Sequence, residues 1–273
     1  MPLTEPQKRI LKILASRRSP ENYLAGATVL HRAEDSPRFS EDIDFFHDIA
    51  DSIAQSAETD ASTLKHFGID LEWLLRTPTF YRAVAIVSGE KLKLEWAVDS
   101  TFRFFPVVED SLCGFRLHET DAAVNKILDL AGRREARDFV DILYIHKTRL
   151  SIGALAWAAC GKDPGYSPAF LLDHAGQHVA YAQDDIDRLS LNEKMNIYDL
   201  KREWLTALER SYELINSLPA SDIGCLYLTP EGTPITPDPE SPDFKGLARH
   251  FGSVRGAWPS ISPFMDHGSG KPS

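Results

Sequence analysis

The feature that most constrains the fold is the segment FSEDIDFF, residues 39–46, whose side chains alternate in character. Ile43 and Phe45 are apolar, and Asp42 and Asp44 lie at the positions that alternate with them. Successive side chains of a β-strand point to opposite faces of the sheet. The alternation therefore predicts a strand that buries one face in a core and presents two carboxylates on the other.

Strand and helix patterns alternate through the first 120 residues. They predict a short helix within 5–18, a brief strand over 22–26, a helix over 27–33, helical structure over 48–76, and strands over 80–88 and 91–99. The last two strands are joined by Gly89 and Glu90, which favours a hairpin. In the second of them Glu95 lies on the face opposite to Trp96, so a third carboxylate belongs to a second strand.

Helical patterns dominate after residue 120. DAAVNKILDLAG (121–132) predicts a helix with Asp121 as N-cap and Gly132 at its end. A second helix is predicted over 134–149, and residues 151–217 are mostly helical. On the second helix the spacing predicts two ion pairs four residues apart, Arg134 with Asp138 and Arg137 with Asp141.

Composition limits the classes of function. The formal charge of −10 argues against a basic surface that holds nucleic acid nonspecifically, so a polyanionic substrate must be met by a local patch or through metal ions. Three cysteines, odd in number and without CxxC spacing, are typical of reduced thiols in a cytoplasm. The segment 8–19 is interrupted by charges, so we expect no signal peptide, no membrane partner and a cytoplasmic location.

The three carboxylates suit phosphoryl transfer. Mg²⁺, or Mn²⁺, prefers hard oxygen ligands, and two such ions can hold the attacking and leaving oxygens of an in-line displacement. Asp42 and Asp44, about 7 Å apart at Cα on one strand face, are close enough to share such a metal pair. The turn at Gly26 and Ala27 adds backbone N–H donors for phosphate oxygens, and Ser40 shares the face of Asp42.

Two motifs carry a resemblance to a known family. Gly26 and Thr28, followed by Arg-Phe-Ser-Glu-Asp-Ile-Asp at 38–44, resemble the active-site signature of the nucleotidyltransferase superfamily, whose fold is polymerase-β-like. More narrowly, the pattern is similar to the AbiEii/AbiGii toxin branch, which includes the MenT toxins. Lys126 and the later Arg-Asp-x-x-Asp at 137–141 resemble a second motif of that branch.

The resemblance implies the fold and its division. It implies an α/β fold of the α+β type, a nucleotidyltransferase core with a short mixed sheet followed by a helical C-terminal region. We expect the core over 1–120, a helical region over 121–217 that completes the active-site cleft, and a hairpin with a partly disordered tail over 218–273.

The resemblance also implies a role for each residue of the motifs. Metal ligands would be Asp42, Asp44 and Glu95; the nucleotide would be held by Gly26, Ala27, Thr28, Ser40 and Lys126; and Asp138 or Asp141 would complete the catalytic set. The sequence departs from the family pattern in having Ala27 where a second glycine is usual and Glu95 where Asp is commoner. The implied reaction adds a nucleotide from an NTP to RNA, with tRNA as acceptor for some members, and implies an antitoxin partner.

Simpler interpretations exist for the same residues. Glu95 shares its face with Lys93 and Asp99, which also fits a solvated strand edge with paired charges. Lys126 fits a solvated helix face, and the later aspartates fit surface pairs with arginine. At the level of function, the alternatives are a noncatalytic module that binds a nucleotide or a partner, and nucleotide transfer to a protein or small-molecule hydroxyl.

Other motifs carry less. An exposed helix face is favoured over a zinc site for His174 and His178, and GSGKPS at 268–273 lacks the strand and first glycine of a phosphate-binding loop. Two basic stretches are candidates for contact with RNA: the arginines Arg133, Arg134 and Arg137, and the segment 244–258, for which an ordinary closing helix is slightly favoured.

Overall fold

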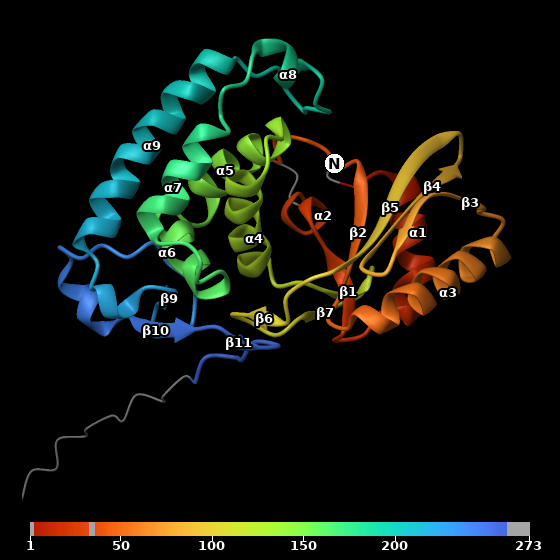
Figure 1. Cartoon of the computed structure of the whole chain (residues 1–273), viewed down its shortest axis with the longest axis horizontal. Coiled ribbons are helices and arrows are strands. Elements are labelled where there is room, and N and C mark those ends of the chain that lie inside the picture. The colour runs from red at the N-terminus through yellow and green to blue at the C-terminus, as the bar shows by residue number, and fades with distance from the viewer. Residues whose placement is uncertain (1–2, 33–35, 261–273) are drawn as a thin grey trace, which may run out of the picture.

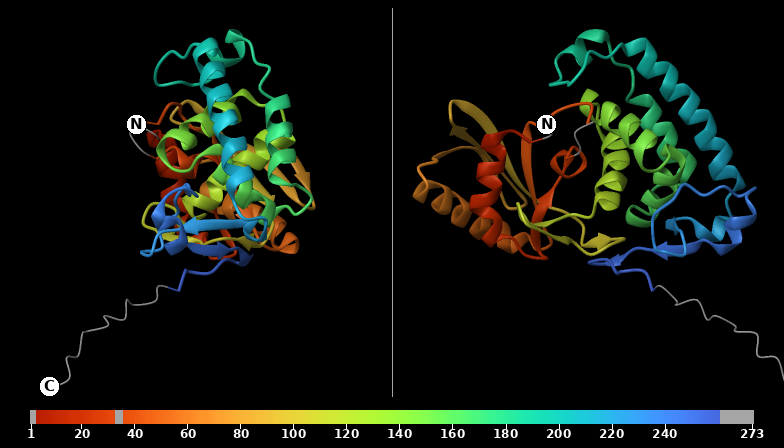
Figure 2. Two further views of the ribbon diagram at one scale, coloured as in Figure 1. Left: turned by 90° about the vertical axis from the view of Figure 1, so that its left-hand side faces the viewer. Right: turned by 180° about the vertical axis from the view of Figure 1, so that it is seen from behind.

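A computed structural model describes residues 3–32 and 36–260 of the chain (Figure 1). The N-terminal half is built on a β-sheet and the C-terminal half on helices, and the two halves lie side by side in Figure 1 and in the view from behind (Figure 2, right). The expected tail at 262–273 lies outside the described residues. The division of the chain at residues 120 and 217 stays a prediction.

The main sheet has seven strands and is mixed, as expected. Its spatial order is β3 (Leu71–Thr77), β4 (Phe80–Val87), β5 (Glu90–Val98), β2 (Asp42–His47), β1 (Asn22–Ala25), β8 (Gly114–Arg116) and β7 (Val108–Asp110). The pairs β2–β5 and β1–β8 are parallel and the other pairs are antiparallel. The predicted hairpin of β4 and β5 is confirmed.

Two helices cover one face of the sheet. They are α1 (Glu5–Leu14), which begins with a capping box formed by Thr4 and Gln7, and α3 (Ile53–His66). Both contact β5, and Ile43, Phe45 and Trp96 are buried on this side of the sheet. Alternation in β2 therefore buries its apolar side chains under α1 and α3, which leaves the aspartates on the opposite face.

The opposite face looks toward the helical half. One helical turn, α2 (Ala27–Leu30), follows β1 on this side, which makes it shorter than the sequence predicts. The helical half comprises α4 (Glu119–Gly132), α5 (Ala136–Thr148), α6 (Ile152–Lys162), α7 (Pro168–Gln177), α8 (Gln183–Asp187) and α9 (Ile197–Ser217). Helix α4 contacts α2, and α9 packs along α6 and α7. The helices predicted after residue 120 are thus confirmed.

The C-terminal segment returns to the sheet half. Strand β9 (Cys225–Leu228) pairs with β10 (Ala248–Phe251), and β11 (Ser253–Val254) pairs with β6 (Phe102–Arg103). Short 3-10 turns lie at Ala15–Arg17, Ala50–Ser52, Ala220–Asp222 and Pro242–Gly246. The chain therefore connects its two halves a second time, through β6 and β11.

The helix predicted over 48–76 is wrong in its second part. Helix α3 ends before Gly68, whose φ of 75° is the left-handed conformation that stops a helix, and Leu71–Thr77 forms the edge strand β3. Leu71, Leu74 and Leu75 have helix-like spacing. The hydrogen bonds that β4 provides outweigh that local preference.

One further prediction is confirmed in part and another is wrong. The hairpin expected within 218–273 is present, because Leu228 and Pro234 form an antiparallel bridge and Ile235 N donates to the carbonyl oxygen of Tyr227, but its return arm, which contains two prolines, forms no extended strand. The partner of β9 is β10, so the closing helix expected within 244–258 is wrong.

The N-cap of α4 is His118, not Asp121. The Asp121 carboxylate is buried and accepts hydrogen bonds from the backbone N–H groups of Phe104 and Phe105, at 2.7 and 3.0 Å. Burial raises the pKa of Asp121 to about 6, although these two hydrogen bonds oppose the shift. Asp121 therefore fastens the loop after β6 to the first turn of α4.

Candidate active site

Parallel pairing of β2 with β5 brings the three predicted carboxylates together. Asp44 is the register partner of Glu95, and Asp42 is the partner of Lys93. All three carboxylates line one cavity of about 220 Å³ between the sheet and α4. Burial, together with the neighbouring charges of Glu95 and Asp42, raises the pKa of Asp44 to about 7. The site therefore has an excess of negative charge around Asp44.

Cations lie against the outer two carboxylates. Lys93 Nζ and Arg137 Nη1 approach the same oxygen, Oδ2 of Asp42, at 3.0 and 2.9 Å. Arg82 Nε donates to Glu95 at 2.8 Å from the adjacent strand β4. Asp44 forms no ion pair with any of the residues described. In this state, side-chain cations neutralise Asp42 and Glu95 but leave Asp44 uncompensated.

The turn before α2 is shaped around Asp44. Gly26 has a φ of 66°, and a β-carbon at this position would lie 1.9 Å from Asp44 Oδ2. Ala27 is already the first residue of the helical turn, where φ is negative and a side chain causes no strain. This explains why the first position of the signature must be glycine while the second tolerates alanine.

Thr28 and Ser40 brace the start of β2. Their hydroxyl oxygens lie 2.9 Å apart, and that of Thr28 donates to the carbonyl oxygen of Asp42 at 2.7 Å. Both side chains are buried, but Ser40 lines the cavity and Thr28 does not. Strand β2 begins only at Asp42, so Ser40 reaches the site from the preceding loop. Of the predicted nucleotide-binding residues, Gly26, Ala27, Ser40 and Lys126 therefore face the cavity directly.

Lys126 extends from α4 into the cavity, and its ammonium group contacts three carboxylates. Its Nζ lies 2.8 Å from Asp138 Oδ1, 3.4 Å from Asp141 Oδ2 and 3.5 Å from Asp129 Oδ2. Burial alone would lower the pKa of Lys126, but the carboxylates outweigh it and raise the pKa above its ordinary value. Lys126 is therefore a fixed positive charge, and the solvated helix face considered from the sequence is excluded.

Asp138 and Asp141 are fully buried behind Lys126. Asp141 accepts from Arg38 Nε and Nη2 at 2.6 and 2.7 Å and lies 2.7 Å from His31 Nε2. Burial opposes the ionisation of Asp141, yet Arg38, His31 and Lys126 hold its pKa well below the ordinary value. Neither aspartate lines the cavity, so an effect of either on the chemistry would act through the cavity-lining cations Lys126, Arg133 or Arg38.

The ion pairs predicted along α5 are wrong. Asp138 pairs with Arg133 and Lys126 in place of Arg134, whose guanidinium donates to the carbonyl oxygen of Ala180. Arg137 reaches across to Asp42, not along the helix to Asp141. Buried partners from other elements outweigh the weak pairs that a helix surface offers.

In the second candidate RNA-contact segment, 244–258, three of the four basic side chains are engaged elsewhere. Arg249 pairs with Asp222, Arg255 pairs with Glu21, and His250 Nε2 lies 2.8 Å from the carbonyl oxygen of Phe104. These contacts favour a structural role for the segment.

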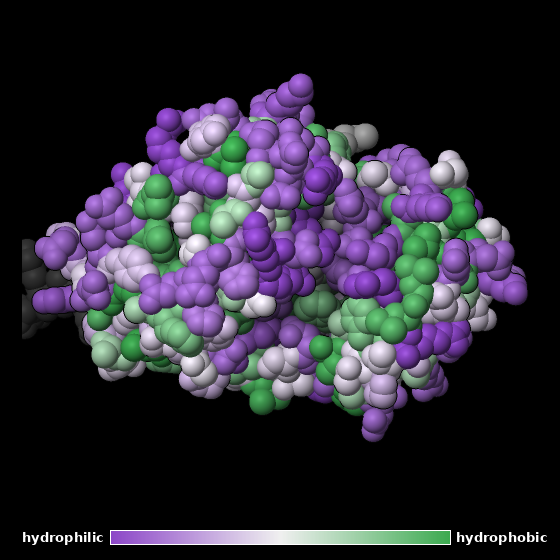
Figure 3. Space-filling view, turned by 45° about the horizontal axis from the view of Figure 1, so that its top comes forward, coloured by the Kyte–Doolittle hydropathy of each residue, from purple (hydrophilic) through white to green (hydrophobic). Residues whose placement is uncertain are grey.

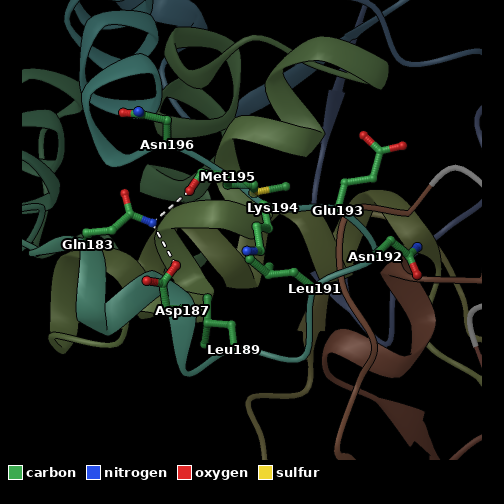
Figure 4. Close-up of a pocket in the computed structure, with 9 residues that line it drawn as sticks. All are labelled: Gln183, Asp187, Leu189, Leu191, Asn192, Glu193, Lys194, Met195 and Asn196. Atoms are coloured by element: carbon green, nitrogen blue, oxygen red, sulfur yellow. Dashed lines mark hydrogen bonds between the residues drawn. The ribbon is translucent and has the colours of Figure 1, made fainter.

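A larger cavity, of about 740 Å³, lies elsewhere. It is lined by residues between 183 and 196, and Gln183 Nε2 donates there to Asp187 Oδ1 and Met195 O (Figure 4). It includes no residue of the two motifs, and its lining has no cluster of acidic groups with cations. In the view of Figure 3, hydrophilic side chains gather around a hollow near the middle of the molecule. The side chains that line a cavity indicate its function better than its volume does, so the 220 Å³ cavity is the candidate active site.

The residues of this cavity fit a divalent metal by their chemistry. Asp42, Asp44 and Glu95 supply hard oxygen donors on one wall of the cavity. Within residues 3–32 and 36–260 no three acidic, histidine or cysteine side chains converge as a ready-made metal site. Binding would therefore require Asp42 and Glu95 to leave their present cationic partners.

Several residues of the site carry no motif signal of their own. Lys93 reaches it only because β5 lies beside β2, Arg82 because β4 lies beside β5, and Arg133 lines it from the end of α4. Arg38 belongs to the signature, but only the tertiary structure shows its role, which is to donate two hydrogen bonds to the buried Asp141 carboxylate. For Arg82, the two-residue period of β4 places it on the face of Glu95, which is the signal that could have identified it.

Fold and site together define a nucleotidyltransferase: a mixed sheet with a glycine turn, paired aspartates on one strand and an acidic residue on the next. The chain belongs to the family described as nucleotidyl transferase AbiEii toxin, Type IV TA system, whose model matches residues 9–217.

Solved structures agree on the fold. MenT4, the nucleotidyltransferase toxin Rv2826c from Mycobacterium tuberculosis H37Rv, superimposes with a TM-score of 0.55 at 13% identity, covering 79% of this chain and 83% of MenT4. A candidate nucleotidyltransferase from H. pylori gives a TM-score of 0.50 at 21% identity, covering 80% of this chain and 99% of its own. A comparison with curated proteins finds no match. No helix in the described part of the chain is long and apolar enough to cross a membrane.

Proposed function

We propose that the protein transfers a nucleotide from an NTP to an RNA hydroxyl, with tRNA as the acceptor class, in a reaction that depends on Mg²⁺ or Mn²⁺. The observation that carries this proposal is the pairing of Asp44 with Glu95 across β2 and β5, with Asp42 on the same face. The family's description as a toxin supports the RNA acceptor, a cognate antitoxin and a cytoplasmic location as parts of the same proposal.

The proposed step is a displacement at the α-phosphorus. The acceptor oxygen forms a bond to that phosphorus while the bond from it to the oxygen that bridges to the β-phosphate breaks, and pyrophosphate leaves. The hydroxyl proton passes to solvent. Mg²⁺ held by Asp42, Asp44 and Glu95 would supply neutralisation of the charge that develops on the reacting phosphate.

The remaining cations of the cavity suit the triphosphate. Lys126 is a positive charge that its ion pair with Asp138 holds in place, and Arg133 and Arg137 are partly exposed at the cavity wall. Arg137 and Lys93 contact Asp42 and would be available to the phosphates if that carboxylate held a metal ion. A planar guanidinium can contact two phosphate oxygens at once.

The test is transfer of label from each of the four α-labelled NTPs to total tRNA, with and without Mg²⁺. We compare the intact protein with Asp42→Ala and with Asp70→Ala, a control in an exposed loop. We expect label on RNA from the intact protein and the control, none from Asp42→Ala, and none after chelation.

The other outcomes separate the alternatives. Label on protein or on a small molecule would change the acceptor and leave the reaction class unchanged. NTP binding without transfer to any acceptor, in the presence of Mg²⁺, would favour the noncatalytic module and contradict the proposal.

A further inference from the structure

A second cavity, of about 160 Å³, adjoins the candidate active site. The two cavities share four lining residues, namely Gly26, Phe46, Lys126 and Asp129. Lys126 thus borders both spaces. A molecule whose phosphates lie against Lys126 and Arg137 can extend its other end into the second cavity.

The walls of this second cavity differ in character. Phe46, Ala122 and Leu128 supply apolar surface from β2 and α4. Besides the shared Gly26, Lys126 and Asp129, the lining is a polar cluster of Asp99, Asn125 and Lys162, which come from the residue after β5, from α4 and from the last residue of α6. A small cavity that combines apolar walls with a polar cluster is the environment that suits a planar heterocycle.

The polar cluster is held in place by its own contacts. Lys162 Nζ lies 2.6 Å from Asn125 Oδ1 and 3.1 Å from Asp99 Oδ2, and its side chain is only 8% exposed. Asn125 Nδ2 lies 3.4 Å from the same oxygen of Asp99. A lysine ammonium has three N–H groups and an asparagine amide has two, so each retains a donor for a ligand.

We propose that the second cavity binds the nucleobase of the NTP, and that Lys162 and Asn125 select the base by donating to an exocyclic carbonyl oxygen. Uracil, cytosine and guanine carry such an oxygen and adenine does not. ATP is therefore the least favoured nucleotide. The proposal rests on the proposed function for the position of the triphosphate.

The test is a calorimetric titration of the full chain with each of the four NTPs and with inorganic tripolyphosphate, in the presence of Mg²⁺. We expect ATP to bind most weakly and at least one other NTP to bind more tightly than tripolyphosphate. In Lys162→Met the affinity for the preferred NTP falls about tenfold, while that for tripolyphosphate changes less than twofold.

Two further variants make the result specific. Leu128→Phe narrows the second cavity without changing the polar cluster. It therefore weakens the binding of all four NTPs and leaves the binding of tripolyphosphate unchanged. Arg255→Gln removes an ion pair with Glu21 that joins the C-terminal segment to the sheet half, yet it lies outside both cavities and leaves every affinity unchanged.

The inference is overturned if NTPs bind no more tightly than tripolyphosphate, if Lys162→Met weakens tripolyphosphate as much as the NTPs, or if neither cavity variant changes any affinity. Because these titrations need no turnover, they separate the two proposals. Selective NTP binding with no transfer to any acceptor would contradict the proposed function and leave this inference standing.

Discussion

A β-carbon added to Gly26 would lie 1.9 Å from Oδ2 of Asp44, so the glycine turn and the central carboxylate of the site are fitted to each other. Gly26→Ala must displace Asp44 or open the turn, and the φ of 66° adds strain. A shift of about 1 Å in a reacting group costs on the order of 10²-fold in rate. We therefore expect nucleotide transfer by Gly26→Ala to fall by about that factor, measured as kcat/KM with the preferred NTP.

Gly68→Ala is the matched control. Gly68 has a φ of 75°, but a β-carbon there meets no atom within 4 Å. This variant isolates backbone strain from the clash, so it loses about 1 kcal/mol of stability and keeps its activity. Equal loss of activity in both variants would show that the contact with Asp44 is unimportant.

Arg137→Gln tests the cation that lies against Asp42. Arg137 Nη1 is 2.9 Å from Asp42 Oδ2, and the side chain is about one-third exposed at the cavity wall. If it turns to the triphosphate when Asp42 takes a metal, its loss raises KM for the NTP by about tenfold, with a smaller change in kcat. Steady-state kinetics with varied NTP measures both quantities.

Arg134→Gln is the control on the same helix end. Its guanidinium donates to the carbonyl oxygen of Ala180 and lines neither cavity. An unchanged KM in Arg137→Gln, or an equal rise in both variants, would remove Arg137 from the nucleotide site.

Asp141→Ala tests the network of buried ion pairs that holds Lys126. Arg38, His31 and Lys126 all contact this fully buried carboxylate, so its removal leaves uncompensated charge in the interior. We expect the free energy of unfolding to fall by about 3–5 kcal/mol. Urea denaturation followed by circular dichroism measures this change.

Asp199→Ala is the comparison for a surface aspartate. Within the described part of the chain Asp199 pairs only with Arg202, and both side chains are more than half exposed. Its loss changes stability by less than about 0.5 kcal/mol. A similarly small effect for Asp141→Ala would mean that water enters and solvates the network.

Asp44→Asn should stabilise the metal-free protein at neutral pH. The pKa of Asp44 is raised to about 7 in the folded state and is near 4 when unfolded. The folded state therefore holds this proton more tightly, and stability falls as pH rises from about 4 to about 7. Asparagine removes that loss, so the variant gains up to about 4 kcal/mol at pH 8, and the gain disappears as pH falls toward 4.

Thermal unfolding at several pH values, with chelator present, measures the difference. Added Mg²⁺ then provides the second test, since it should raise the melting temperature of the intact protein more than that of Asp44→Asn. A stability difference that is independent of pH would contradict the raised pKa.

Local sequence determined several features directly. The alternation in 39–46 gave β2 and its two faces, Gly26 marked the turn, and Lys126 was correctly assigned to a helix after the sheet. These features depend on side-chain periodicity and on backbone conformations that only glycine adopts easily, both of which are short-range properties. Residues 71–77 show the limit of that reasoning, because a helix-like spacing yielded to the hydrogen bonds of a neighbouring strand.

Only the tertiary structure determined which charged side chains contact one another. Glu95 faces Asp44 because β5 lies parallel to β2 in one register, and Arg137 contacts Asp42 because α5 packs across the cavity. For Arg137 the sequence instead predicted a partner four residues along the same helix, Asp141. Charged groups pair where burial removes competing water, and burial depends on how distant segments pack. The sequence by itself determined which chemical groups are present and on which elements they lie, whereas packing determined which of them meet.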